Sequence, residues 1–281
     1  MSTLAAKAIA ALEQQGCCVW VEVVGAEGST PREVGAAMLV TPQGFAGSIG
    51  GGTLEWQAMA EAQAMLGKPR ASRTVTKSLG PDLGQCCGGR VTLRLQSFTG
   101  DDDIAALTQR SLQAASKTTH LHLWGAGHVG RALVLALAPL PFTITWWDVR
   151  HNAFPSHVPE NVTCRLGTPG EMQGPALVLV MTHSHALDFD IVDTALRNPK
   201  FYHVGLIGSK TKRARFMKRL REAGLDEPAQ VRLTCPIGNK SIAGKHPAVI
   251  AASVAVQLLE WQQMLRTATS AFPAPVQSSR L

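Results

Sequence analysis

The feature that most constrains this chain is a glycine-rich turn between a predicted strand and a predicted apolar helix. The strand covers residues 120–124, and Gly125-Ala126-Gly127-His128-Val129-Gly130 follows it directly. Gly125 permits a tight turn, Gly127 lets backbone approach a phosphate, and Gly130 lets the helix pack on the strand. The pattern predicts the first strand-turn-helix unit of a dinucleotide-binding fold.

The rest of the C-terminal half continues as alternating strands and helices. We predict strands at residues 142–148, 161–166, 176–182, 203–207 and 232–234, and helices ending near 140 and covering 210–223 and 247–265. The run Ala176–Thr182 is almost continuously apolar, as is typical of a parallel strand buried on both faces. We therefore predict a Rossmann-like, doubly wound parallel sheet over residues 119–266, followed by a disordered tail over 267–281.

Asp148 ends the second predicted strand of this sheet, where it could accept a hydrogen bond from a ribose hydroxyl. A bound nucleotide, or another phosphate-bearing ligand, is one interpretation of the turn at Gly125. The alternative is a turn that only packs the helix on the strand. No paired acid and base suited to hydride transfer can be recognised beside it.

The first hundred residues show another pattern, in which short strands dominate. We predict helices over residues 3–14 and 53–66, the second with Thr53 as N-cap, and strands over 17–24, 36–40, 45–49, 73–78 and 90–97. The expected organisation is an α+β domain over residues 1–100 and a linker over 101–118. The polar, helix-compatible stretch 101–116 is interpreted as the tail of the first domain and the connection to the second.

Two other predicted strand ends carry polar residues at the edge where open α/β sheets bind ligands. Gly208-Ser209-Lys210 opens a basic helix, so free N–H groups, the helix dipole and Lys210 favour an anion. A solvated helix face is the alternative for the basic stretch 210–221. His183 and His185 would point the same way in extended backbone, so one metal or ligand contact is one interpretation of this segment. A plain polar loop is the alternative.

In the first domain, the segment most suggestive of chemical reactivity is Cys86-Cys87-Gly88-Gly89. Backbone N–H groups of a glycine-rich turn can lower the pKa of a thiol, and a thiolate is a soft ligand for a metal centre or for sulfur. Two small residues in a tight loop are the alternative. Arg32 and the glycines Gly51 and Gly52 before Glu55 could line a cleft that binds an anion. We predict structural roles for the remaining four cysteines, which are Cys17, Cys18, Cys164 and Cys235.

Charge and composition exclude several classes of protein. The chain has 281 residues and a formal net charge of +7, which suits anionic ligands but does not choose among them. Aromatic residues are only 5%, too few for a base-stacking surface, so nucleic-acid binding is not expected. No apolar run approaches the roughly 18 residues of a membrane span, and the N-terminus lacks a signal-peptide pattern. We expect a cytoplasmic protein without a membrane partner.

Several of these motifs together resemble the XdhC/CoxI family along nearly the whole chain. In the first domain they are Gly28–Arg32, Gly47–Glu55 and Cys86–Gly89. In the second they are Trp124–Gly130, Gly205–Lys210 and Cys235-Pro236-Ile237-Gly238 leading to His246-Pro247-Ala248. The stretch from Cys235 to Lys245 is closer to the xanthine dehydrogenase branch than to the CoxI branch.

The resemblance implies an accessory protein without turnover of its own. Such proteins bind the molybdenum cofactor, a molybdopterin with a terminal phosphate, while a cysteine desulfurase helps to replace an oxo ligand by sulfido. They then deliver it to the molybdenum-binding subunit of apo-xanthine dehydrogenase. The rival interpretation is an NAD(P)-dependent oxidoreductase on the Rossmann-like domain. The apolar surface of 247–265 favours a homodimer.

Overall fold

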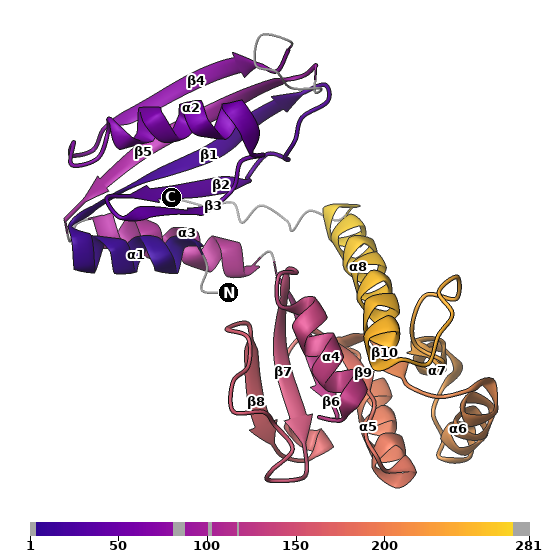
Figure 1. Cartoon of the computed structure of the whole chain (residues 1–281). Helices are drawn as coiled ribbons and strands as arrows, with labels where there is room; N and C mark the ends of the chain where they lie inside the picture. Colours follow the sequence, from indigo (N-terminus) through magenta and orange to yellow (C-terminus); the bar gives the residue numbers. More distant parts are fainter. Residues whose placement is uncertain (1–3, 81–87, 101–102, 117, 272–281) are drawn as a thin grey trace, which may run out of the picture. The chain divides into compact units, whose positions relative to one another are not determined.

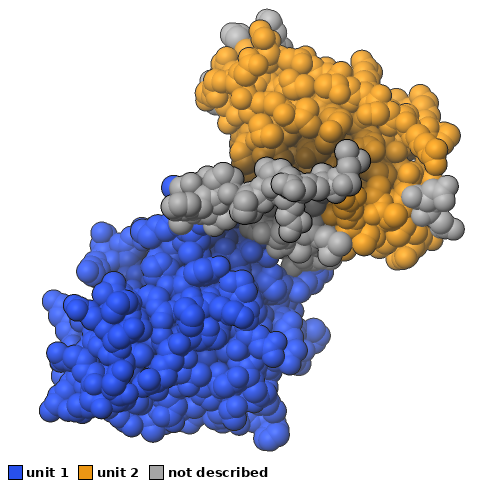
Figure 2. Space-filling model, turned by 180° about the vertical axis from the view of Figure 1, so that it is seen from behind, with its two compact units in different colours: residues 1, 118–281 blue, residues 2–117 orange. Residues whose placement is uncertain are grey.

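The computed structural model describes residues 4–80, 88–100, 103–116 and 118–271. The chain divides into two compact units, an N-terminal unit of residues 2–117 and a C-terminal unit of residues 118–281, shown in orange and blue in Figure 2. The sheet of the N-terminal unit is antiparallel and that of the C-terminal unit is parallel. The predicted fold class, an α+β domain followed by a Rossmann-like domain, is confirmed.

The N-terminal unit is a five-stranded sheet with helices on both faces (Figure 1). Its elements are α1 (Leu4–Gln15), β1 (Cys17–Glu27), β2 (Ala37–Thr41), β3 (Gly44–Gly47), α2 (Gly52–Gln63), β4 (Ser72–Ser78), β5 (Arg90–Thr99) and α3 (Ile104–Ser116). The strands are ordered β3-β2-β1-β5-β4, so that β1 lies at the centre.

Alternating side chains along β1 explain why both faces of this sheet are covered. Val19, Val21 and Val23 are fully buried in the core that α2 closes. Cys18 and Trp20 point to the opposite face, where they pack with α1 and α3. Burial raises the pKa of the Cys18 thiol to about 12, which suits a structural side chain.

The segment expected as a linker, residues 101–118, contains α3, which belongs to the N-terminal unit. Leu107 of α3 is fully buried in the same core as Phe98. Arg110 donates hydrogen bonds to Glu22 and Gln96, over 3.2 Å and 2.7 Å. The segment is therefore anchored to the sheet, although its polar composition suggests a connection.

The C-terminal unit is a six-stranded parallel sheet. Its elements are β6 (Thr119–Trp124), α4 (His128–Leu137), β7 (Phe142–Asp148), β8 (Val162–Leu166), a 3-10 turn (Pro169–Glu171), β9 (Ala176–Val180), α5 (His185–Arg197), β10 (Phe201–Leu206), α6 (Lys210–Glu222), α7 (Glu227–Val231), β11 (Leu233–Thr234) and α8 (Pro247–Ala271). The strand order β8-β7-β6-β9-β10-β11 is that of a Rossmann fold, and it reverses between β6 and β9. Helices α4 and α8 close one face, and α5, α6 and α7 close the other (Figure 1).

Helix α8 extends to Ala271, so it includes the first residues of the segment expected to be a disordered tail; residues 272–281 lie outside the described range. Among the described residues, α8 is long and apolar enough to cross a membrane, although polar residues interrupt it and leave no continuous apolar run. Ala251, Val254 and Leu258 are nevertheless buried in the core beside α4. Its apolar composition is that of a core helix.

Candidate functional site

Three loops that carry sequence motifs meet in the N-terminal unit, at a place we call the glycine junction (residues 28–32, 48–52 and 88–89). The Gly89 N–H donates to the Ser29 carbonyl over 3.1 Å, and a Cβ at Gly89 would collide with that same carbonyl. Gly50 has a φ of 130°, and a Cβ there would lie 2.5 Å from Pro31 Cγ. Glycine is therefore required at both contacts.

Cys86 and Cys87 lie outside the described residues, and in the chain they directly precede Gly88 and Gly89 of this junction. Among the described cysteines, burial raises the pKa of the thiols of Cys18, Cys164 and Cys235. A raised pKa disfavours the reactive thiolate. The structural roles predicted for these three side chains agree with their environment.

The loop of three glycines is closed onto a carboxylate of the protein itself. Glu55 Oε2 accepts hydrogen bonds from the Ser48 hydroxyl at 2.6 Å and from the N–H groups of Ile49 and Gly51, each at 3.1 Å. Burial raises the pKa of Glu55, but these hydrogen bonds outweigh it, and the net pKa lies below its usual range. The anion held by this loop is therefore Glu55.

This carboxylate also explains how α2 begins. The helix starts at Gly52 with Gly51 as its N-cap, and no side chain caps it. The prediction of Thr53 as the N-cap is wrong, because Glu55 already binds the loop N–H groups that precede the helix. Arg32 lies beside the same loop, where its guanidinium donates to the Ser48 carbonyl over 3.5 Å and pairs with Glu33 over 3.3 Å.

In the C-terminal unit, the turn at Gly125 has the geometry its sequence predicts. Gly125 has a φ of 108°, and a Cβ on it would collide with the Met181 carbonyl. A Cβ on Gly130 would collide with the Gly125 carbonyl, which is how the helix comes close to the strand. A Cβ on Gly127, in contrast, would meet no atom within 4 Å. Gly127 thus faces open space at the start of α4, as a phosphate-approach glycine would.

The Asp148 carboxylate already accepts several hydrogen bonds from neighbouring residues. It accepts from the Ala126 N–H at 2.8 Å, and from the N–H and guanidinium of Arg150 at 2.9 to 3.0 Å. Burial raises the pKa of this carboxyl, but the bonds from Arg150 and Ala126 prevail and lower it to about 2. The predicted contact to a ribose hydroxyl stays a prediction, and the side chain already holds the glycine turn in place.

The carboxyl ends of β9 and β10 are joined by a buried ion pair. Lys212 Nζ of α6 lies 2.6 Å from Asp188 Oδ2 of α5 and donates to the Ile207 carbonyl over 2.9 Å. Asp188 Oδ1 accepts from the hydroxyl and the N–H of Thr182, at 2.7 Å and 3.1 Å. The Gly125 turn, which follows β6, contacts Met181, which follows β9. The turn and the ion pair therefore lie at the same edge of the sheet.

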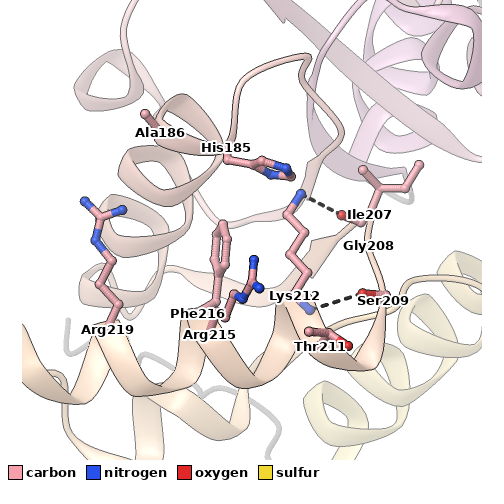
Figure 3. A pocket seen from close by; sticks show the side chains of 10 residues that line it. All are labelled: His185, Ala186, Ile207, Gly208, Ser209, Thr211, Lys212, Arg215, Phe216 and Arg219. Atoms are coloured by element: carbon pink, nitrogen blue, oxygen red, sulfur yellow. Dashed lines mark hydrogen bonds between the residues drawn. The ribbon is translucent and has the colours of Figure 1, made fainter.

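Beside this ion pair lies a cavity of about 570 Å³, which we call the α5–α6 cavity (Figure 3). Its basic lining residues are His185, Lys212, Arg215 and Arg219. Ile207 and Phe216 supply apolar wall, and Ser209 and Thr211 bring the start of α6 to its rim.

Both helices that border the cavity begin with a serine cap. Ser184 accepts from the Leu187 N–H at the start of α5, and Ser209 accepts from the Lys212 N–H at the start of α6. His185 is the first residue of α5, so the predicted extended arrangement of His183 and His185 is wrong. His185 lines the cavity, whereas His183 and Lys210 are exposed and are not among its lining residues.

Both halves of the chain match models of one protein family. Residues 11–76 match the XdhC and CoxI family, and residues 121–258 match the XdhC Rossmann domain. The chain belongs to the XdhC and CoxI family.

Two known proteins place this XdhC/CoxI chain among its relatives. It is 30% identical over 268 residues to YqeB of Escherichia coli K12, an uncharacterized protein, with 89% of this chain matched but only 45% of the relative. A Bacillus halodurans protein, whose crystal structure is described as that of a xanthine dehydrogenase, is 20% identical, has a TM-score of 0.78 and is covered to 98%, as is this chain. The second likeness shows the shared fold.

Within this XdhC/CoxI chain, the described site residues that were predicted, other than the exposed His183 and Lys210, fall into three groups. Arg32, Gly51, Gly52 and Glu55 lie at or beside the glycine junction, where Glu55 is bound internally. Gly125, Gly127, Gly130 and Asp148 form one turn. Ser209 lies at the rim of the α5–α6 cavity.

The sequence pattern does not single out Lys212 and Arg215 within the basic stretch 210–221, although both line the cavity, and it does not point to Asp188, which lies behind Lys212. The sequence does carry a signal for α5, because Ser184 precedes an acidic residue in the first turn, Asp188. Apolar residues at helical spacing follow: Phe189, Ile191, Val192, Ala195 and Leu196. The sequence could not tell that Lys212, rather than Lys210, points toward Asp188 and the cavity.

Proposed function

We propose that this protein is a xanthine dehydrogenase accessory protein that carries the molybdenum cofactor in the cytoplasm. It would hold the cofactor while a cysteine desulfurase supports sulfuration, and then deliver it to the molybdenum-binding subunit of apo-xanthine dehydrogenase. Membership of the XdhC and CoxI family supports this proposal, as does the resemblance of residues 235–245 to the xanthine dehydrogenase branch.

The observation that carries the proposal is that the sequence motifs of residues 28–32, 48–52 and 88–89 meet at the glycine junction. Gly89 is bound to Ser29, and Gly50 packs on Pro31, so the chain segment that follows Cys86 and Cys87 is held beside Arg32. Consecutive Cα atoms lie only about 3.8 Å apart, which ties Cys87 to the junction through Gly88. Thiolates are soft ligands, suited to molybdenum and to sulfur, and Arg32 supplies a nearby positive charge.

The first test is whether the protein retains the cargo. The protein would be purified from cells that make the cofactor and assayed for molybdenum and pterin. We expect both in the wild type and much less of both in Cys86→Ala/Cys87→Ala, with an unchanged thermal midpoint. Cys17→Ala is the matched control, because that thiol lies outside the junction. Full retention by the folded double variant would contradict the role of the two thiols.

A second test separates a carrier from an enzyme. Apo-xanthine dehydrogenase would be mixed with rising amounts of protein loaded with sulfurated cofactor, in the absence of desulfurase. A carrier should restore activity in proportion to the amount added, because each molecule delivers what it holds, and without a nicotinamide. Many turnovers per molecule, or strict dependence on a nicotinamide, would contradict delivery.

Many turnovers that depend on a nicotinamide would support an NAD(P)-dependent oxidoreductase, which is the rival function. The open space at Gly127 favours this rival. The engagement of Asp148 by Arg150 and Ala126 argues against it, since the ribose acceptor is already bound. The predicted homodimer is likewise proposed here. Val256, Leu259 and Met264 of α8 are exposed apolar residues that a second copy could cover.

A further inference from the structure

The α5–α6 cavity has a one-sided distribution of charge. Its lining residues include His185, Lys212, Arg215 and Arg219, and none of its described lining residues is acidic. Asp188, the carboxylate behind Lys212, is only 1% exposed and is absent from the lining. Negative charge entering this cavity therefore meets cations and no carboxylate.

The cationic side chains of the cavity differ in whether they already have a partner within the protein. Lys212 is neutralised by Asp188, which also fixes the position of its ammonium group. Arg219 lies over the Phe189 ring, with its guanidinium carbon 3.8 Å from the ring centroid. Arg215 is exposed and forms no ion pair within the described part of the chain. Arg215 thus presents a guanidinium that no described residue pairs with, and this is the group best suited to bind an oxyanion through two parallel hydrogen bonds.

The N-termini of α5 and α6 add backbone N–H donors to the lining of the same cavity. The serine caps take up the N–H groups of Leu187 and Lys212. The N–H groups before them, such as those of Ala186 and Thr211, have no partner among the described residues, and both residues line the cavity. The positive ends of two helix dipoles therefore coincide with the cationic side chains.

We propose that the α5–α6 cavity binds the phosphate group of a small phosphorylated ligand. A volume of about 570 Å³ suits a ligand with a ring attached to its phosphate, and Ile207 and Phe216 offer apolar wall to such a ring. The site is separate from the glycine turn, because none of residues 125–130 lines it. The phosphate could come from the cofactor of the proposed function or from a nucleotide, and the site itself does not depend on that function.

Isothermal titration of the purified full chain with inorganic phosphate, pyrophosphate and ADP tests the site directly. We expect saturable binding that weakens as salt is added. Arg215→Gln should weaken it about 10-fold or more, since a charge-assisted hydrogen bond contributes roughly that much. Arg221→Gln, the same change of charge on the same helix outside the cavity, should leave binding unchanged.

Thr211→Glu gives a variant in which loss of binding cannot be ascribed to unfolding. A glutamate in the first turn of α6 suits the helix dipole, so the thermal midpoint should be kept or raised. The new carboxylate at the cavity rim should repel phosphate and abolish the titration signal. Equal affinities in wild type, Thr211→Glu and Arg215→Gln would overturn the proposal, as would the absence of any binding by the wild type.

The arms of the experiment distinguish the two sources of phosphate and the two proposals. Binding of ADP that is lost in Gly127→Val but kept in Thr211→Glu would assign the nucleotide to the glycine turn and overturn the cavity. Loss of co-purified pterin in Thr211→Glu would identify the cofactor as the source. Phosphate binding at the cavity in a protein that never retains pterin would support the site and contradict the proposed function.

Discussion

Lys212 of α6 and Asp188 of α5 form an ion pair of 2.6 Å in which the carboxylate is 99% buried and the ammonium group is also shielded. The pair also reaches backbone at the ends of two neighbouring strands, through Ile207 and Thr182. Four elements of the sheet edge are therefore coupled through one pair of charges.

Removal of one member of this pair should be costly. Lys212→Met leaves the Asp188 carboxylate buried and unpaired, and we expect the free energy of unfolding to fall by about 3 to 5 kcal/mol. Urea unfolding monitored by tryptophan fluorescence measures it. Lys218→Met, which breaks only the exposed pair with Glu222, should change stability by less than about 1 kcal/mol. Similar losses in the two variants would show that the buried pair has no special role.

Glu55→Gln should loosen the loop that carries the three glycines. The neutral amide accepts weaker hydrogen bonds from Ser48, Ile49 and Gly51, so we expect a loss of about 1 to 3 kcal/mol. Faster hydrogen exchange at the Ile49 and Gly51 amides would locate the effect, and Glu13→Gln on the exposed side of α1 is the control. Unchanged exchange at both amides would contradict the role of the carboxylate.

The lowered pKa of Glu55 also gives this contribution a pH dependence. Because the carboxyl binds its proton less readily in the folded protein, the contribution is present above the unfolded pKa of about 4.5 and is lost as the pH falls through the folded value. The difference in stability between wild type and Glu55→Gln should therefore shrink on acidification below pH 4.5.

His122 should make the protein less stable in mild acid. Its Nδ1 accepts from the Trp147 indole at 3.0 Å, and its Nε2 then donates to the Gln173 carbonyl at 2.9 Å, so the ring is held neutral. Burial lowers the pKa of this imidazole from 6.5 to about 4. Since the unfolded chain binds the proton first, stability should fall by about 3 kcal/mol between pH 6.5 and pH 4.

The control for this pH dependence is His122→Gln, which removes the titrating group from the same place. Its unfolding free energy should fall less steeply over that range, because the contribution of His122 is gone while those of His120 and His203, whose pKa values burial also lowers, remain. Parallel pH profiles for the two proteins, measured by urea unfolding, would refute the assignment.

The glycines of the turn after β6 should separate into two kinds. Gly125→Ala and Gly130→Ala place a Cβ against backbone carbonyls and should cost several kcal/mol or prevent folding. Gly127→Val meets open space in extended backbone, so the thermal midpoint should change little. If a ligand uses this turn, its affinity should drop in Gly127→Val; wild-type affinity would mean that the turn is only architectural.

The sequence predicts the Rossmann-like sheet well because its signals are local. The run Ala176–Thr182, the turn at Gly125 and the basic helix after Gly208 are each contained in a few residues, and the structure has β9, α4 and α6 at those places. Helix α3 was harder to place, because its attachment depends on Leu107 and Arg110 contacting residues on distant strands.

The candidate site is only partly predictable for the same reason. Glycine positions follow from the turn pattern, and Gly127 keeps the open environment that its position in the motif suggests. Which charges are free does not follow, because Glu55 and Asp148 are bound by neighbours in the fold. Lys210 and Lys212 look equivalent in the sequence, yet only Lys212 turns toward Asp188.

The pairing of β1 with β5 sets the order in which the glycine junction can form during synthesis. These central strands are separated along the chain, with Cys17 opposite Thr99 and Glu27 opposite Arg90. Until residue 99 has left the ribosome, β1 has one unpaired edge, and Gly89 has no completed strand to hold it against Ser29. A truncated or nascent chain therefore lacks the junction, and Gly89 is fixed beside Ser29 only once the N-terminal sheet is complete.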